Sequence, residues 1–124
     1  MATYWTDGGT KNNGQAFQQS VICGTTKKKT LFFLPVGNKT NNEAELLAIL
    51  EILVTSRAKH VQIYSDSMLA VNLIKGIWKT KVSRLLYILA DIKNQRKKYI
   101  HFDINWIPRE QNRAGWIIEK TLGL

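Results

Sequence analysis

Short stretches of alternating hydrophobic and polar residues fill the first third of the chain, and this period is typical of β-strands. The stretches are TYWTD at 3–7, QAFQQSVIC at 15–23 and KKKTLFFLP at 27–35. Gly8 and Gly9 are expected to end the first strand, and a turn around residues 24–26 to join the other two. The pattern predicts an antiparallel meander.

The spacing becomes helical from residue 41 onwards. In NNEAELLAILEILVTSR, apolar side chains recur on one face of a helix, with Asn41 or Asn42 available as the N-cap. The apolar positions are Leu46, Ile49, Leu50 and Leu53. This segment predicts the first helix of the chain.

Strands and helices alternate in the remaining sequence. HVQIYS at 60–65 predicts a strand, and SMLAVNLIK at 67–75 predicts a helix that stops at Gly76. The segments that follow are a helix RLLYILADIKNQRKK at 84–98, a strand IHFDINWI at 100–107 ended by Pro108, and a short helix from about Asn112 to Leu122. A strand that follows a helical crossover pairs in parallel with an earlier strand. We therefore expect one α/β domain over residues 1–124, with a five-stranded mixed sheet and helices on both faces.

Charge points to a polyanionic partner. The chain has a formal charge of +9, from 18 Lys and Arg against nine Asp and Glu. Nucleic acid is favoured over a membrane surface, because the cations are scattered and face no apolar stripe. Cys23 is the sole cysteine, and no apolar run is long enough to cross a bilayer. These features predict a cytoplasmic monomer that does not bind membranes.

Three acids occupy positions where a site could form. Asp7 and Asp66 lie at the ends of predicted strands, and Glu45 lies in the first turn of the helix at 41–57. Taken singly, they read as a turn residue, an N-cap and an acid that complements the helix dipole. If the two strands are neighbours, however, the three carboxylates converge at the carboxyl end of the sheet.

Such a cluster needs a cation. Like charges about 4 Å apart repel by about 4 kcal/mol at an effective dielectric of 20. A ligand set made of oxygen alone favours Mg²⁺ or Mn²⁺ over zinc. His60 and His101, in or beside the later strands, are interpreted as structural.

The acidic segments resemble those of type 1 ribonuclease H. YWTDGG resembles that family's first strand and catalytic aspartate, TNNEAELLAILEIL its helix with the catalytic glutamate, and IYSDSMLAVNLIKGIWK its third acidic motif and following helix. IWKTK runs straight into RLLYIL, as in the short forms without a basic protrusion. Order and spacing agree over nearly the whole chain.

The resemblance implies a ribonuclease H-like fold and an endonuclease that cuts the RNA strand of RNA–DNA hybrids. Two Mg²⁺ or Mn²⁺ ions would activate water and stabilise the leaving oxygen. Matched by motif, the catalytic and metal-binding residues are Asp7, Glu45 and Asp66, whereas Glu43 points elsewhere on its helix. The matched substrate-binding residues are Gly8, Gly9, Thr40, Asn41, Asn42, Met68 and Trp78. Capping explains Thr40 and Asn41 equally, and packing explains Met68 and Trp78.

One family acid is missing. The segment EQNRAGW aligns with a family pattern that carries a fourth aspartate on the nucleophile's side, and Gly115 occupies that position. Asn112, Glu110 or Glu119 could substitute, the ion could be held by Asp7, phosphate and water, or the chain could be inactive. The family's loop histidine is absent as well, with Arg109 and Glu110 in its neighbourhood. An impaired or manganese-preferring enzyme is the favoured interpretation.

Two alternatives remain open. The first is an inactive module of the same fold that binds hybrids or double-stranded RNA. The second is the ribonuclease H-like domain of a reverse transcriptase or mobile element.

Overall fold

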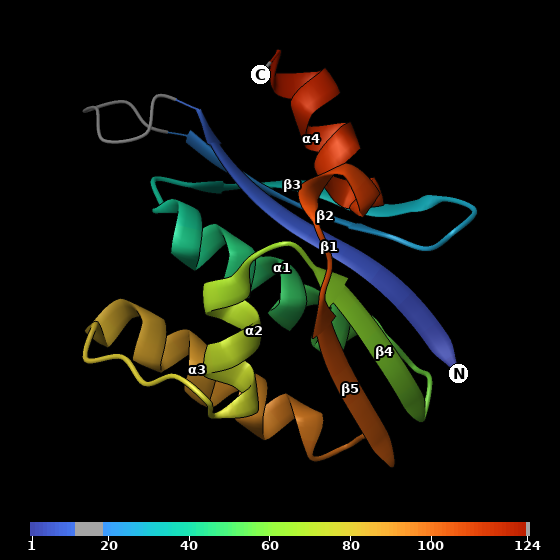
Figure 1. Cartoon of the computed structure of the whole chain (residues 1–124), viewed down its shortest axis with the longest axis vertical. Helices are drawn as coiled ribbons and strands as arrows, with labels where there is room; N and C mark the ends of the chain where they lie inside the picture. Colours follow the sequence, from blue (N-terminus) through green and yellow to red (C-terminus); the bar gives the residue numbers. More distant parts are fainter. Residues whose placement is uncertain (12–18, 124) are drawn as a thin grey trace.

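A five-stranded mixed sheet forms the centre of the computed structural model, which describes residues 1–11 and 19–123 (Figure 1). The strands are β1 (Ala2–Lys11), β2 (Gln19–Thr25), β3 (Thr30–Gly37), β4 (His60–Ser65) and β5 (His101–Trp106). The helices are α1 (Asn41–Thr55), α2 (Met68–Lys75), α3 (Ser83–Arg96) and α4 (Arg113–Leu122), with a 3₁₀ turn at Arg109–Gln111. The predicted α/β architecture is confirmed.

The strand order is β3-β2-β1-β4-β5. β2 pairs antiparallel with both β1 and β3, whereas β4 is parallel to β1 and β5 is parallel to β4. The predicted meander is therefore extended on one side by two parallel strands that arrive through helical crossovers.

Helices cover both faces of the sheet (Figure 1). α1 packs on one face, with α2 and α3 beside it, and its buried side chains Leu46, Ile49 and Leu53 join the main hydrophobic core. α4 packs on the opposite face, where Ala114 and Ile118 meet the buried Cys23. None of the helices in the described ranges is long and apolar enough to span a membrane.

Two predicted boundaries on the N-terminal strands were wrong. β1 does not end at Gly8 but continues to Lys11. A Cβ at Gly8 would lie 2.3 Å from the backbone carbon of Ala44, so the glycine permits α1 to approach the strand closely. The turn after β2 lies at residues 26–29, where Thr26 N–H donates to the Lys29 carbonyl at 2.9 Å, rather than at 24–26. Residues 15–18 of the second predicted strand lie outside the described ranges.

The N-cap of α1 also differs from the prediction. Thr40, and neither Asn41 nor Asn42, caps the helix: its hydroxyl accepts from Glu43 N–H, and the Glu43 carboxylate accepts from Thr40 N–H. This reciprocal arrangement is a capping box. Ser67, and not Asp66, caps α2. Glu43 is thus engaged at the helix start, and Asp66 is free for another role.

The strand register positions the site. Pairing between β1 and β4 ends at Thr6 and Ser65, so Asp7 and Asp66 both follow the last paired residues of the two strands. The carboxyl ends of parallel strands lie at this edge, where ligands bind in open α/β sheets. His60 and His101 lie far from it, at the start of β4 and β5, with their rings stacked 6.3 Å apart.

Candidate active site

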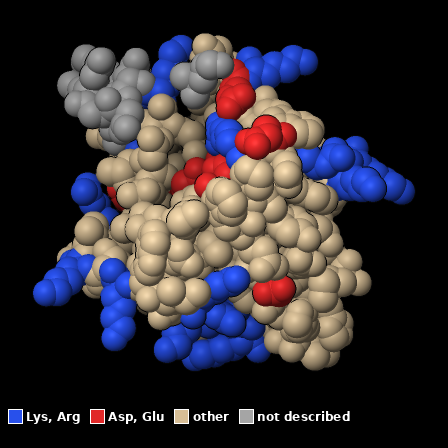
Figure 2. Space-filling model, in the orientation of Figure 1, with Lys and Arg blue, Asp and Glu red and all other residues tan. Residues whose placement is uncertain are grey.

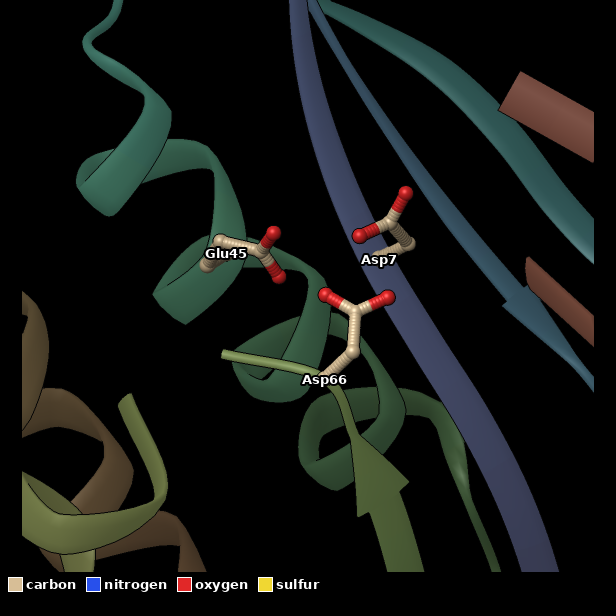
Figure 3. Close-up of side chains that lie close together, drawn as sticks. All are labelled: Asp7, Glu45 and Asp66. Atoms are coloured by element: carbon tan, nitrogen blue, oxygen red, sulfur yellow. The ribbon is translucent and has the colours of Figure 1, made fainter. Parts of the chain in front are cut away.

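Three carboxyl groups from three separate elements point toward one another (Figure 3). Asp7 comes from β1, Glu45 from α1 and Asp66 from the residue after β4. One oxygen from each lies within 4.8 Å of the others. The convergence that the strand pattern predicted is therefore present.

Burial and mutual repulsion raise the pKa values of two of these acids. Burial and the charge of Asp66 raise the pKa of Asp7 to about 6, against the opposing effects of Glu45 and Arg109. Burial also raises the pKa of Glu45 well above its usual value, with the charges of Asp7 and Asp66 adding to the effect. A cluster of this kind binds cations readily, because a bound cation removes the repulsion.

Glu45 has an unsatisfied oxygen in the site. The residue is 9% exposed, and its Oε2 has no hydrogen-bond partner among the described residues. An unpaired buried carboxylate oxygen is costly in the folded state. Carboxylate oxygens from Asp7 and Asp66 lie beside it, and these are the hard ligands that Mg²⁺ and Mn²⁺ take. The donor set fits a divalent ion.

Arg109 lies against the same cluster. Its Nη1 donates to both carboxylate oxygens of Asp7, at 3.0 and 2.9 Å, and to Asp66 Oδ2 at 3.0 Å. Burial lowers the pKa of the guanidinium, but the charges of Asp7 and Asp66 and the hydrogen bonds to Glu119 and Asp66 together outweigh this and leave the pKa raised. The guanidinium is thus a permanent positive charge within the acid cluster.

The three residues proposed as substitutes for the missing fourth acid have other contacts. Asn112 is fully buried, and its Nδ2 donates to Asp66 Oδ2 and to the Thr6 carbonyl, both at 2.9 Å. Its Oδ1 accepts from Ala114 N–H and so caps α4. Glu119 accepts from Arg109 Nε at 2.9 Å. Glu110 is exposed, and its backbone carbonyl accepts from Trp116 Nε1.

The predicted substrate-binding residues fall into two groups. Asn41, Asn42, Met68 and Trp78 are exposed, and Thr40 is half-buried. Gly8 and Gly9 are instead buried: a Cβ on Gly9 would lie 2.6 Å from Ile118 of α4. Close packing against α1 and α4 accounts for both glycines without a substrate.

Charge is unevenly distributed over the molecular face that carries the acids. Figure 2 shows acidic side chains near the middle of this face and basic side chains projecting around its margins. A polyanion approaching the carboxylates would meet these lysines and arginines.

Sequence reasoning did not find the role of Arg109, which it named only as a neighbour of the missing histidine. The available signal was Gly115. A Cβ there would lie 3.2 Å from Arg109 Cζ and Nη1, so the missing side chain makes room for the guanidinium.

Comparison with known proteins agrees with this geometry. The family model for RNase H matches residues 1–116. The bifunctional protein Rv2228c of Mycobacterium tuberculosis is 28% identical over 112 residues, which are 86% of this chain but 31% of that protein. The chain therefore spans about a third of the length of this relative.

Solved structures show the same fold. LC11-RNase H1, isolated from compost and solved in complex with an RNA/DNA hybrid, has a TM-score of 0.76 and 27% identity, covering 98% of this chain and 99% of that one. RNase H1 of the archaeon Halobacterium salinarum superposes with a TM-score of 0.81 at 18% identity, covering 99% and 98%. With its matched residues, its sheet order and its converging acids, this chain belongs to the RNase H family.

Proposed function

We propose that this chain is a metal-dependent endoribonuclease that hydrolyses the RNA strand of RNA–DNA hybrids, with Asp7, Glu45 and Asp66 holding Mg²⁺ or Mn²⁺. The observation that carries the proposal is the convergence of three carboxylates within 4.8 Å, one of them with a buried unpaired oxygen. Bound there, a divalent ion would polarise the phosphate and lower the pKa of a bound water.

The chain's own residues would supply position and charge. β1 and the end of β4 fix the two aspartates at one sheet edge, and α1 brings Glu45 across from the neighbouring layer. Asn112 orients Asp66 through its Nδ2. We propose that the hybrid contacts the half-buried Thr40, the exposed Asn41 and Asn42 at the start of α1, Met68 at the start of α2 and Trp78 beyond its end.

The hybrid is the proposed substrate for two reasons. LC11-RNase H1 was solved with an RNA/DNA hybrid, and its fold matches nearly all of this chain. The formal charge of +9 suits a duplex polyanion.

We propose that residues 1–124 form one domain, which acts as a cytoplasmic monomer.

The test is to incubate the protein with a hybrid labelled on its RNA strand, first in Mg²⁺ and then in Mn²⁺. RNA fragments should appear, and Glu45→Gln should reduce their rate of formation by at least about a hundredfold. Glu43→Gln is the matched control, because it removes the same charge two positions away on the same helix but leaves a residue that can keep the capping box. Equal losses in both variants would argue against Glu45 as a metal ligand.

A second function is supported by Gly115 and Arg109. With no acid at residue 115 and a guanidinium on Asp7, the chain could bind hybrids or double-stranded RNA without cutting them. Binding with no RNA fragments in either ion would favour this module over the enzyme.

A further inference from the structure

The guanidinium of Arg109 is held on the acid cluster from several directions. Nη1 bridges Asp7 and Asp66 at 2.9–3.0 Å. On the outer side, Nε donates to Glu119 at 2.9 Å. Both Nη1 and Nε of this arginine therefore have carboxylate partners. A surface cation that only lies near the acids would lack these hydrogen bonds.

Gly115 makes this placement possible. A Cβ at residue 115 would lie 3.2 Å from both Cζ and Nη1 of Arg109, tighter than an ordinary van der Waals contact. A larger side chain there would compete with the guanidinium for the same space. The glycine and the arginine thus form one local arrangement.

This arrangement leaves one side of the acid cluster free. Nη1 engages both oxygens of Asp7, and Asp66 Oδ2 is shared between Arg109 and Asn112. Glu45 Oε2 is buried without a partner, and Asp66 Oδ1 makes no hydrogen bond among the residues that the structure describes. The free ligand oxygens therefore belong to Glu45 of α1 and to Asp66 just after the end of β4.

Charge counting shows what the pair replaces. The three ionised carboxylates of the cluster carry −3, and Arg109 with one divalent ion brings the sum to zero; Glu119, on the solvent side of Arg109 and 44% exposed, is screened by water and left out of the sum. In the two-ion arrangement expected from the resemblance, a fourth aspartate and its ion would together add +1. Arg109 over Gly115 also adds +1, so both arrangements leave the same net charge for the phosphate.

We infer that Arg109 is a resident cation that takes the place of the second metal ion on the Gly115 side, so that the site binds a single divalent ion. The inference deepens the proposed function and rests on metal binding by the same three acids. A guanidinium supplies positive charge at a fixed place, but it has no open coordination position for a water molecule.

Calorimetric titration with Mn²⁺, in the absence of nucleic acid, tests the inference without any cleavage. The unaltered chain should bind one ion. Arg109→Gln should bind Mn²⁺ on the order of tenfold more tightly, because it removes a positive charge in contact with the ligand carboxylates. Arg109→Lys keeps the charge and should stay within about threefold of the unaltered chain.

The matched control is Arg96→Gln, which removes the same charge at the end of α3, where Arg96 lies over Phe102. Its Mn²⁺ affinity should be unchanged. The double variant Arg109→Gln with Gly115→Asp restores an acid and frees the space beside it, and should bind two ions. Thermal melts in EDTA establish that each variant is folded before titration.

Two ions bound by the unaltered chain, or an unchanged Mn²⁺ affinity in folded Arg109→Gln, would overturn the inference. A stoichiometry of two in the unaltered chain overturns the inference even if a variant fails to fold, and tighter Mn²⁺ binding by Arg109→Gln distinguishes it from a second ion that enters only with the phosphate. One bound ion without RNA cleavage would contradict the proposed function but support the inference. RNA cleavage with two bound ions would support the proposed function but contradict the inference.

Discussion

Asp7 is fully buried, and Glu45, Asp66 and Arg109 surround it. Ionisation of this residue therefore lowers the stability of the folded chain. Its carboxyl group would be accessible to water in the unfolded chain but is buried beside other acids in the folded one. Burial and the charge of Asp66 raise its pKa to about 6 from a usual value of 3.8. Ionised Asp7 is therefore electrostatically destabilised in the folded chain, and a bound cation would remove that destabilisation.

The raised pKa predicts how stability changes with pH in EDTA. Because folded Asp7 binds its proton more tightly than unfolded Asp7, its contribution is full below about pH 4 and is lost as the pH rises to about 6. The shift corresponds to about 3 kcal/mol. Thermal melts of the unaltered chain and Asp7→Asn across this window should show Asp7→Asn gaining relative stability as the pH rises. A difference between the two that does not change with pH would contradict the raised pKa.

Arg109 and Gly115 should be energetically coupled. Gly115→Asp should destabilise the chain in the absence of metal, because its Cβ would lie 3.2 Å from the Arg109 guanidinium and its carboxylate would add a like charge beside Asp7 and Asp66. Part of that loss should depend on the crowding with Arg109, which Arg109→Gln relieves. In a double-mutant cycle with Arg109→Gln, measured by chemical denaturation, we therefore expect a coupling of about 1 kcal/mol, with the double variant more stable than the sum of the two single losses. Additive effects would mean that the two positions do not touch.

At the scale of elements, the site depends on the close approach of α1 to β1. Gly8 allows this approach, because any Cβ there would meet the backbone of Ala44 and Glu45 at 2.3–2.6 Å. Glu45, which follows Ala44 in α1, then reaches the sheet edge where Asp7 and Asp66 lie. The distance between α1 and β1 thus sets the distance between the carboxyl group of Glu45 and those of the two aspartates.

Gly8→Ala should consequently destabilise the fold by about 3 kcal/mol, since the helix backbone must move to admit the methyl group. Gly9→Ala is the matched control: its Cβ would meet a side-chain methyl group of Ile118 at 2.6 Å, so the clash involves one side chain and not the backbone of a helix. Urea denaturation should show a clearly smaller loss for Gly9→Ala. Mn²⁺ affinity should also fall in Gly8→Ala if displacement of α1 carries Glu45 away from the aspartates.

On the scale of the whole molecule, most Lys and Arg side chains lie away from the acid cluster, with Arg109 as the exception. Basic side chains surround a face with acids near its middle (Figure 2), and the chain as a whole carries a charge of +9. Attraction of a duplex would come from the basic margin, whereas metal binding would come from the centre. These two functions should respond to different changes in conditions.

Hybrid binding should therefore depend steeply on salt. With Asp7→Asn, which prevents turnover, affinity measured by fluorescence anisotropy should fall by at least about tenfold between about 50 and 200 mM salt, as phosphate contacts release counterions. Mn²⁺ binding, measured over the same range, should change less, because its ligands are buried or nearly so. An affinity for hybrid that is insensitive to salt would contradict a role for the basic margin.

The sequence by itself determined the type and order of the elements, because hydrophobic periodicity is a local property that can be read without knowing the tertiary contacts. It also marked Asp7, Glu45 and Asp66. Asp7 and Asp66 lie at the predicted strand ends and Glu45 on the intervening helix, so the three converge when the strands pair in parallel. The RNase H resemblance carried by the same segments agrees with the family match.

Tertiary structure alone decided the features that depend on contacts between distant positions. Gly8 and Gly9 are strand residues rather than strand ends, because they pair with Ile22 and Val21 of β2, and α1 and α4 pack where their side chains would be. Arg109 and Asp7 are 102 positions apart, and no local pattern records their contact. The positive charge that Arg109 brings to the acid cluster follows from that contact.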